Sequence, residues 1–379
     1  MFIHFFSFTM FPPASSITST AVYGIGILML ITSFIGLVLK KNFRSNPMDY
    51  KVSLFIVSII ISSFMANLYW DQLFAMSLKG YIYFYIYALY FFLVLLDVSS
   101  ERVEFIFKLF FFSTLIVFLI DFITFPNPLF SWRSEERRDG ITIFFFGQGF
   151  TFLGAFYYLN SFFLNKKVHH LLWFLIAAFC LFYLTQSRMN LLALIAGFFI
   201  LLLSSDVKRK YLIAIFILAL GAIIYFSSGV FNGIKDASAD QAEYYKEDIR
   251  LMALNYFIFD HQGGISTIIF GNGVPFANSS LGLASEKAAG MGFWTADLGL
   301  IGIFSYFGIL GVVVWLFFFY SVFTMKNSRN VIYLKVYFVT LLTTAFVAYA
   351  IFEPGFMPAT ILALYLVRCH TNVDPVLSE

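Results

Sequence analysis

Long apolar stretches recur through most of this chain, and only one long polar gap interrupts them, from Gly229 to about Leu298. A helix needs about 20 apolar residues to cross the hydrocarbon core of a bilayer. With 60% hydrophobic and 12% charged residues, the composition is that of an integral membrane protein. We therefore expect an all-α polytopic protein with about 11 transmembrane helices. The candidate spans are residues 18–39, 52–69, 79–96, 105–125, 141–164, 170–186, 189–203, 211–228, 299–323, 332–351 and 354–369, of which 189–203 and 354–369 are short.

Positive charge is concentrated in every second turn between these stretches. Of the 24 lysines and arginines, 15 fall on one predicted side: Lys40, Lys41, Arg44, Lys51, Arg102, Lys108, Lys166, Lys167, Lys208, Arg209, Lys210, Lys326, Arg329, Lys335 and Arg368. An excess of Lys and Arg marks the cytoplasmic side of a membrane protein. We therefore expect the N-terminus and the polar gap to lie outside, and the C-terminus inside.

This topology divides the chain into four parts. Residues 1–228 form a membrane bundle of about eight spans, 229–298 an external loop, 299–369 about three more spans, and 370–379 a cytoplasmic tail. The loop carries a predicted amphipathic helix. Its signals are a capping box of Ser238 with Gln241, and an apolar face of Tyr245, Ile249, Met252 and Tyr256. Such a helix can lie on the membrane surface.

Several classes of site are missing from the sequence. It contains no P-loop, dinucleotide fingerprint, HExxH or CxxC pattern, and no D-x-D pair of the kind that holds a metal in many glycosyltransferases. Ionisable residues fall near the ends of the candidate spans, which disfavours ion-coupled transport without excluding it. We expect no cofactor, no metal ion and no nucleic-acid partner.

Arginines on the predicted outer side form a candidate anion site, because the guanidinium fork binds two phosphate oxygens at once. Arg188 has no acid near it in sequence, and Arg250 falls on the predicted loop helix. Arg137 and Arg138 stand beside Glu135, Glu136 and Asp139, so local pairing is an equally simple explanation for them.

Four further polar residues are candidates for the same outer face. Gln148 lies between Gly147 and Gly149, whose small size allows a helix or a substrate to approach closely. His261 follows the loop helix, where a histidine can also simply compensate the helix dipole. Asp297 stands where the loop re-enters the membrane, and it could alternatively cap the next span. Glu353 precedes Pro354 on the same side.

The order of these motifs resembles the bacterial O-antigen polymerase and O-antigen ligase superfamily. The likeness rests on Ser187-Arg188 before a Leu-rich span, on Arg250 with Ala253 and then Ile269-Phe-Gly-Asn-Gly273, and on Asp297-Leu-Gly299 with Gly308-Ile-Leu-Gly311. Arg138-Asp-Gly140 is a weaker fourth match. Ligase-type members tend to carry a His-Asn pair where this chain has Asp297-Leu298, which favours the polymerase branch.

The resemblance implies an external glycosyltransferase of the bacterial plasma membrane that builds O-antigen, capsule or a related polysaccharide. Its substrate would be an oligosaccharide carried on undecaprenyl diphosphate, and a chain-length regulator protein is a possible partner. We expect Arg188 and Arg250 to stabilise the departing diphosphate and Asp297 to act as general base. Arg137, Arg138, Gln148, His261 and Glu353 would bind substrate, with Glu353 or His261 as the reserve base.

Two other classes of function are alternatives for this sequence. A polysaccharide flippase would be a transporter, and such proteins usually show internal repeats and broken helices. A sugar O-acyltransferase would carry its catalytic histidine nearer the cytoplasmic side, where His169 and His170 stand beside Lys166 and Lys167. Transfer of finished glycan by a ligase is the closest alternative within the resembling family.

Overall fold

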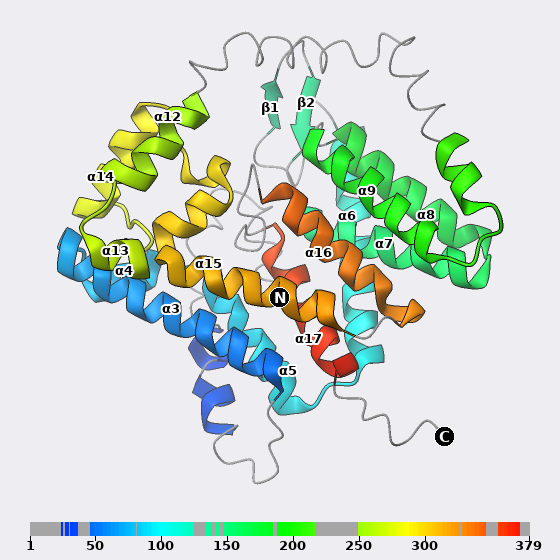
Figure 1. The fold of residues 1–379 in the computed structure, drawn as a ribbon, viewed down its shortest axis with the longest axis horizontal. Coiled ribbons are helices and arrows are strands. Elements are labelled where there is room, and N and C mark those ends of the chain that lie inside the picture. Colours follow the sequence, from blue (N-terminus) through cyan, green and yellow to red (C-terminus); the bar gives the residue numbers. More distant parts are fainter. Residues whose placement is uncertain are drawn as a thin grey trace.

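The structure is a computed structural model of the 379-residue chain. It describes residues 24–25, 27–29, 31–36, 46–80, 82–124, 134–137, 141–144, 147–184, 188–216, 249–325, 328–345 and 355–371. Helices dominate this part of the chain (Figure 1). Three of them are long and apolar enough to cross a membrane, namely α3 (Pro47–Trp70), α6 (Ser100–Ile123) and α15 (Leu300–Thr324). The expectation of an α-helical membrane protein is thereby confirmed, while the number of spans stays a prediction.

Two groups of helices flank a central one. The first group contains α3, α4 (Phe74–Gly80), α12 (Ile249–Asn255), α13 (Ile265–Phe270), α14 (Ser280–Gly290) and α15, and the second contains α6, α7 (Gln148–Asn165), α8 (Val168–Phe179), α9 (Arg188–Ser204) and α16 (Ile332–Thr344) (Figure 1). Between them runs α17 (Met357–Thr371), which contacts helices of both groups. Residues 357–368 of α17 are all buried, as expected for a short helix that is apolar on every face.

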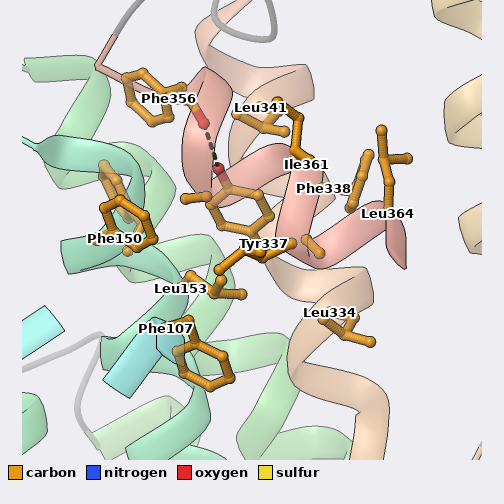
Figure 2. Packing of buried hydrophobic residues seen from close by; sticks show 14 of the residues in the cluster. Phe107, Phe150, Leu153, Leu334, Tyr337, Phe338, Leu341, Phe356, Ile361 and Leu364 are labelled. Atoms are coloured by element: carbon orange, nitrogen blue, oxygen red, sulfur yellow. Dashed lines mark hydrogen bonds between the residues drawn. The ribbon is translucent and has the colours of Figure 1, made fainter. Parts of the chain in front are cut away.

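The main core lies where α7, α16 and α17 meet (Figure 2). Tyr337 of α16 is fully buried there, and its hydroxyl donates a hydrogen bond to the Phe356 carbonyl over 3.5 Å and lies 3.0 Å from Thr360 Oγ1. A buried tyrosine needs such a partner because its hydroxyl has left water. The bond ties α16 to the start of α17.

Shorter segments of other geometry join these helices. They are η2 (Ile82–Tyr87), η7 (Thr295–Leu298) and η8 (Arg329–Val331), which are 3-10 helices, and η3 (Cys180–Leu184) and η6 (Tyr256–Asp260), which are π-helices. The predicted span over 79–96 is therefore not one helix. It divides into α4, η2 and α5 (Ala88–Leu96).

Among the described residues, strands occur in one place, the antiparallel hairpin of β1 (Ser134–Arg137) and β2 (Ile141–Phe144). The predicted helix over 141–164 thus begins late, at Gln148. Ile141, Thr142 and Ile143 are β-branched types that favour strands, and Gly147 takes the left-handed backbone (φ 42°) immediately before α7. The first residues of the apolar run therefore form a strand, and the helix starts only after Gly147.

Contacts between helix ends define two ends of the molecule. At one end Arg368 Nε donates to Asp49 Oδ1 (2.9 Å), which joins the end of α17 to the start of α3. Tyr365 of α17 donates to the Val98 carbonyl before α6, Tyr333 of α16 donates to Glu104 of α6, and Asn160 of α7 donates to the Arg329 carbonyl of η8. We call this the basic end, because Lys51, Lys108, Lys166, Arg329 and Arg368 all belong to it.

Candidate functional site

The opposite end, which we call the rim, gathers helix ends from distant parts of the sequence. The amide of Leu300 donates to the Ala345 carbonyl (3.0 Å), so the start of α15 meets the end of α16. The amide of Gly149 donates to the Gly355 carbonyl (3.1 Å), so the start of α7 meets the approach to α17. These contacts bring together segments that belong to both groups of helices.

Glycine at position 149 is required by this approach. A Cβ there would lie 2.8 Å from Phe356 Cα and 3.0 Å from the Gly355 carbonyl oxygen. The predicted close approach at Gly147-Gln148-Gly149 therefore occurs, and the approaching element is the start of α17.

Gln148 itself contacts the start of α9. Asn190 Nδ2 donates to Gln148 Oε1 over 3.4 Å, and Asn190 is buried while Gln148 is half-buried. Arg188 is the first residue of α9, two positions before Asn190. The structure thus brings the backbone of Arg188 to the same part of the rim as Gln148. Asn190 was not among the predicted site residues, although it stands in the same turn as Arg188.

Asp297 lies on η7, immediately before α15. Its side chain is exposed, and the residue that caps α15 is Gly299, whose φ is 53°. The alternative explanation of Asp297 as a helix cap is therefore wrong. An exposed carboxylate at this position is available to a substrate.

Arg250 lies on α12, which packs against η7. Ala253 and Phe257 on one face of this segment are buried together with Ala288 and Leu298. Arg250 is exposed, as are Ile249 (45%) and Met252 (49%), two members of the predicted apolar face. Tyr256, a further member of that face, packs against the buried cluster. Ser238, Gln241 and Tyr245 lie outside the described residues.

Of the three remaining predicted site residues, the structure describes the backbone of one. Arg137 ends β1 and pairs with Ile141 in the hairpin. Arg138 and Glu353 lie outside the described residues. Figure 1 shows the hairpin and α12 toward the same edge of the molecule.

His261 is buried in a ring of aromatic side chains. Its ring centre lies 5.0 Å from that of Trp70, 5.5 Å from that of Tyr256 and 5.2 Å from that of Phe257, and only 4% of the residue is exposed. Burial lowers the pKa of His261 to about 4, because an imidazolium there would lose its hydration. His261 is therefore neutral near pH 7, and its ring packs among the aromatic side chains that surround it. Its proposed contact with substrate stays a prediction.

The Phe270-Gly-Asn-Gly273 motif is a packing element. Asn272 is buried, and its Nδ2 donates to the His261 carbonyl (2.9 Å) and to the Ser305 carbonyl (3.3 Å). Its Oδ1 accepts from Trp70 Nε1 (3.0 Å). One side chain thus joins α3, the loop and α15.

A break in α15 provides the acceptors for this motif. Gly308 has φ 64° and ψ −163°, which interrupts the helix. The amides of Asn272 and Gly273 donate to the carbonyls of Ser305 and Tyr306, both over 3.0 Å. Unsatisfied carbonyls are costly away from water, so the loop completes the bonding of the broken helix.

This motif reaches well below the rim. A Cβ on Gly273 would lie 2.9 Å from the Ser62 carbonyl oxygen, and Ser62 precedes the end of α3 by about eight residues, or about 12 Å of helix. Gly308 follows the start of α15 by a similar length. The segment through Gly273 therefore re-enters the helical bundle and turns back.

Gln72 fixes the return of this segment. It is fully buried, and its Nε2 donates to Ser77 Oγ (2.8 Å) and to the Val274 carbonyl (3.0 Å). Its Oε1 accepts from the Phe276 amide (3.0 Å) and from Ser279 Oγ (2.6 Å). All four hydrogen-bonding positions of the amide are used. Sequence patterns carry no signal for Gln72, and Asn272 enters the prediction only as a member of the Ile269–Gly273 motif.

Within the described ranges, no three His, Cys, Asp or Glu side chains are grouped so that they could hold a metal ion. The rim offers arginine, amide and carboxylate groups, which can bind an anion and accept a proton. Comparison with known protein families finds no match for the chain, and no curated protein is significantly similar to it.

Proposed function

We propose that the chain is a membrane glycosyltransferase that polymerises oligosaccharide repeats carried on a polyprenyl diphosphate. The observation that carries the proposal is a pair of contacts at the rim, one between two motif segments and one beside Asp297. The starts of α7 and α9 touch through Gln148 and Asn190, and the start of α15, which follows Asp297, adjoins the end of α16. These four helix ends come from four separated parts of the sequence.

The proposed reaction needs few groups from the protein. A hydroxyl oxygen of the incoming repeat attacks the anomeric carbon of the growing chain, and the bond from that carbon to the diphosphate oxygen breaks. The diphosphate leaves with the bonding electrons, and the hydroxyl proton passes to a base. The site must therefore stabilise negative charge and accept a proton.

The residues of the rim can meet these two needs. Arg188 begins α9, so its positive charge adds to the partial positive charge of a helix N-terminus, and both favour an anion. We assign Arg188 and Arg250 to the diphosphate and Asp297 to the proton. The predicted topology would place the rim on the outer face of the bacterial plasma membrane.

The test is electrophoresis of surface polysaccharide from a deletion strain that carries each variant. Wild type should restore a ladder of chain lengths to a strain with single repeats. Arg188→Lys should lose most of the ladder although the charge is kept, because the fork is lost. Arg102→Lys, an exposed arginine of the basic end, is the matched control and should keep the ladder.

Asp297→Asn should abolish chain extension with normal membrane insertion, whereas Asp260→Asn, another exposed acid of the loop, should not. A full ladder from Arg188→Lys would refute the diphosphate role. Repeats trapped on the inner face in the deletion strain would indicate a flippase. Long polymer that is made in the deletion strain but never attached to the cell surface would indicate a ligase.

A further inference from the structure

Two adjoining cavities at the basic end lie far from the rim and play no part in the proposed reaction. One is a polar pocket of about 160 Å³ between the ends of α7 and α9 and η8. The other is an apolar groove of about 660 Å³ between α7, the start of α8, α9 and residues 206–213. Phe163, Lys166 and Asp206 line both, so the two form one continuous amphipathic site.

The pocket and the mouth of the groove carry an excess of positive charge. Lys166, Lys208 and Arg329 are cationic, and Asp206, which pairs with Arg329, is the single carboxylate among the lining residues. Arg329 and Asp206 are about two-thirds exposed, at 65% and 67%, so their ion pair leaves the arginine open to a further anion. Surface pairs of this kind hold each other weakly.

Local backbone structure places Lys166 and Arg329 in the lining of the same pocket. Lys166 has φ 56°, a left-handed position at a helix end that glycine or asparagine usually occupies. Asn160 donates from its amide to the carbonyls of Arg329 (3.0 Å) and Asn330 (3.3 Å), which fixes η8 against α7. The same amide thereby holds the backbone of Arg329 next to the end of α7, where Lys166 lies.

The apolar part extends away from this charged mouth. Leu159, Phe162, Leu171, Phe198, Leu202 and Ile213 line it. The exposed side chains nearby on α8, such as Leu172 (53%) and Leu175 (53%), are of the kind that faces lipid. A soluble anion would leave this groove unused, whereas a molecule with a charged head and hydrocarbon chains would fill both parts.

We propose that this site binds an anionic glycerophospholipid from the leaflet at the basic end. The phosphate lies in the pocket near Lys166, Lys208 and Arg329, and an acyl chain lies in the groove. Basic pockets between transmembrane helices on the cytoplasmic side bind such headgroups in other membrane proteins. The proposal does not depend on the reaction at the rim.

The experiment measures lipid retained by the full-length protein in neutral detergent, by native mass spectrometry, with phosphatidylglycerol or phosphatidylcholine of the same chains. Wild type should prefer phosphatidylglycerol. Lys166→Gln with Lys208→Gln should weaken its binding by about fivefold for each charge removed. The matched control is Lys167→Gln with Arg209→Gln, which removes the same charge from neighbouring positions that line neither cavity. It should bind as wild type does.

Two further arms separate the headgroup from a soluble anion. Inorganic phosphate and glycerol phosphate should neither bind detectably nor compete with phosphatidylglycerol at equal concentration. Equal binding of the two lipids by wild type would overturn the proposal, as would an equal loss in the control pair. Competition by inorganic phosphate would show that the pocket takes a free anion and would also overturn it. Thermal unfolding of each variant without lipid confirms that it is folded.

Discussion

Replacing Asn272 tests whether the re-entrant segment is held by one buried amide. Asn272→Ala removes the acceptor of Trp70 Nε1 and the donor to the His261 carbonyl, which lie 3.0 and 2.9 Å away. The Ser305 carbonyl keeps the bond from the backbone amide of residue 272. The buried His261 carbonyl and the part-buried Trp70 Nε1 therefore lose these partners, at about 1–3 kcal/mol each. We expect the free energy of unfolding to fall by about 2–6 kcal/mol.

Asn272→Asp should be more harmful than Asn272→Ala at pH 8. The carboxylate keeps an acceptor for Trp70 but places a charged oxygen against the carbonyls of His261 and Ser305. Unfolding in mixed micelles with increasing dodecyl sulfate measures both variants, with Asn330→Ala, an exposed asparagine, as the control. Wild-type stability in Asn272→Ala, or a more stable Asn272→Asp, would refute this account of the segment.

Two further perturbations follow from the same region. Gly308→Ala should lower the free energy of unfolding by about 3 kcal/mol or more in the same assay. Its φ is 64°, and a Cβ there would lie 2.4 Å from the Ile269 carbonyl carbon. The control Gly290→Ala should change little, because a Cβ at residue 290 meets nothing within 4 Å. The pKa of His261 is lowered from 6.5 to about 4 in the folded protein, so its contribution is complete above pH 6.5 and is lost as the pH falls toward 4. That loss is about 3 kcal/mol, at about 1.36 kcal/mol per pKa unit. His261→Phe should flatten the profile of unfolding free energy over this range, and an unchanged profile would contradict the assignment.

The sequence located the long helices well where an apolar run ends at a clear boundary. The predicted span over 189–203 is α9, Arg188–Ser204, and the span over 299–323 is α15, Leu300–Thr324. A charged residue or a glycine stands at each start. Where aromatic and β-branched residues continue the apolar run, hydropathy cannot mark the change, so the 3-10 segment Ile82–Tyr87 and the strand Ile141–Phe144 were predicted as helix.

The residues that hold the re-entrant segment were harder to find, because their partners are remote in sequence. Gln72 bonds to Val274 and Ser279, and Asn272 bonds to Trp70. A single buried amide carries no periodic signal, and the turn after Trp70 contains only one acid. A charged residue stands out in an apolar sequence without knowledge of its partners, which is why Arg188 and Asp297 were predicted as site residues.

The break in α15 and the re-entrant segment satisfy each other's backbone hydrogen bonds. Irregular backbone is tolerated at membrane depth only where protein or water satisfies it. Gly308 frees carbonyls of Ser305 and Tyr306, and the amides of Asn272 and Gly273 occupy them. Because this exchange is buried, it supports the loop that carries Arg250 and Asp297. Substitutions in it should therefore change stability first and chain extension only as a consequence, whereas substitutions at the exposed Asp297 should change chain extension alone.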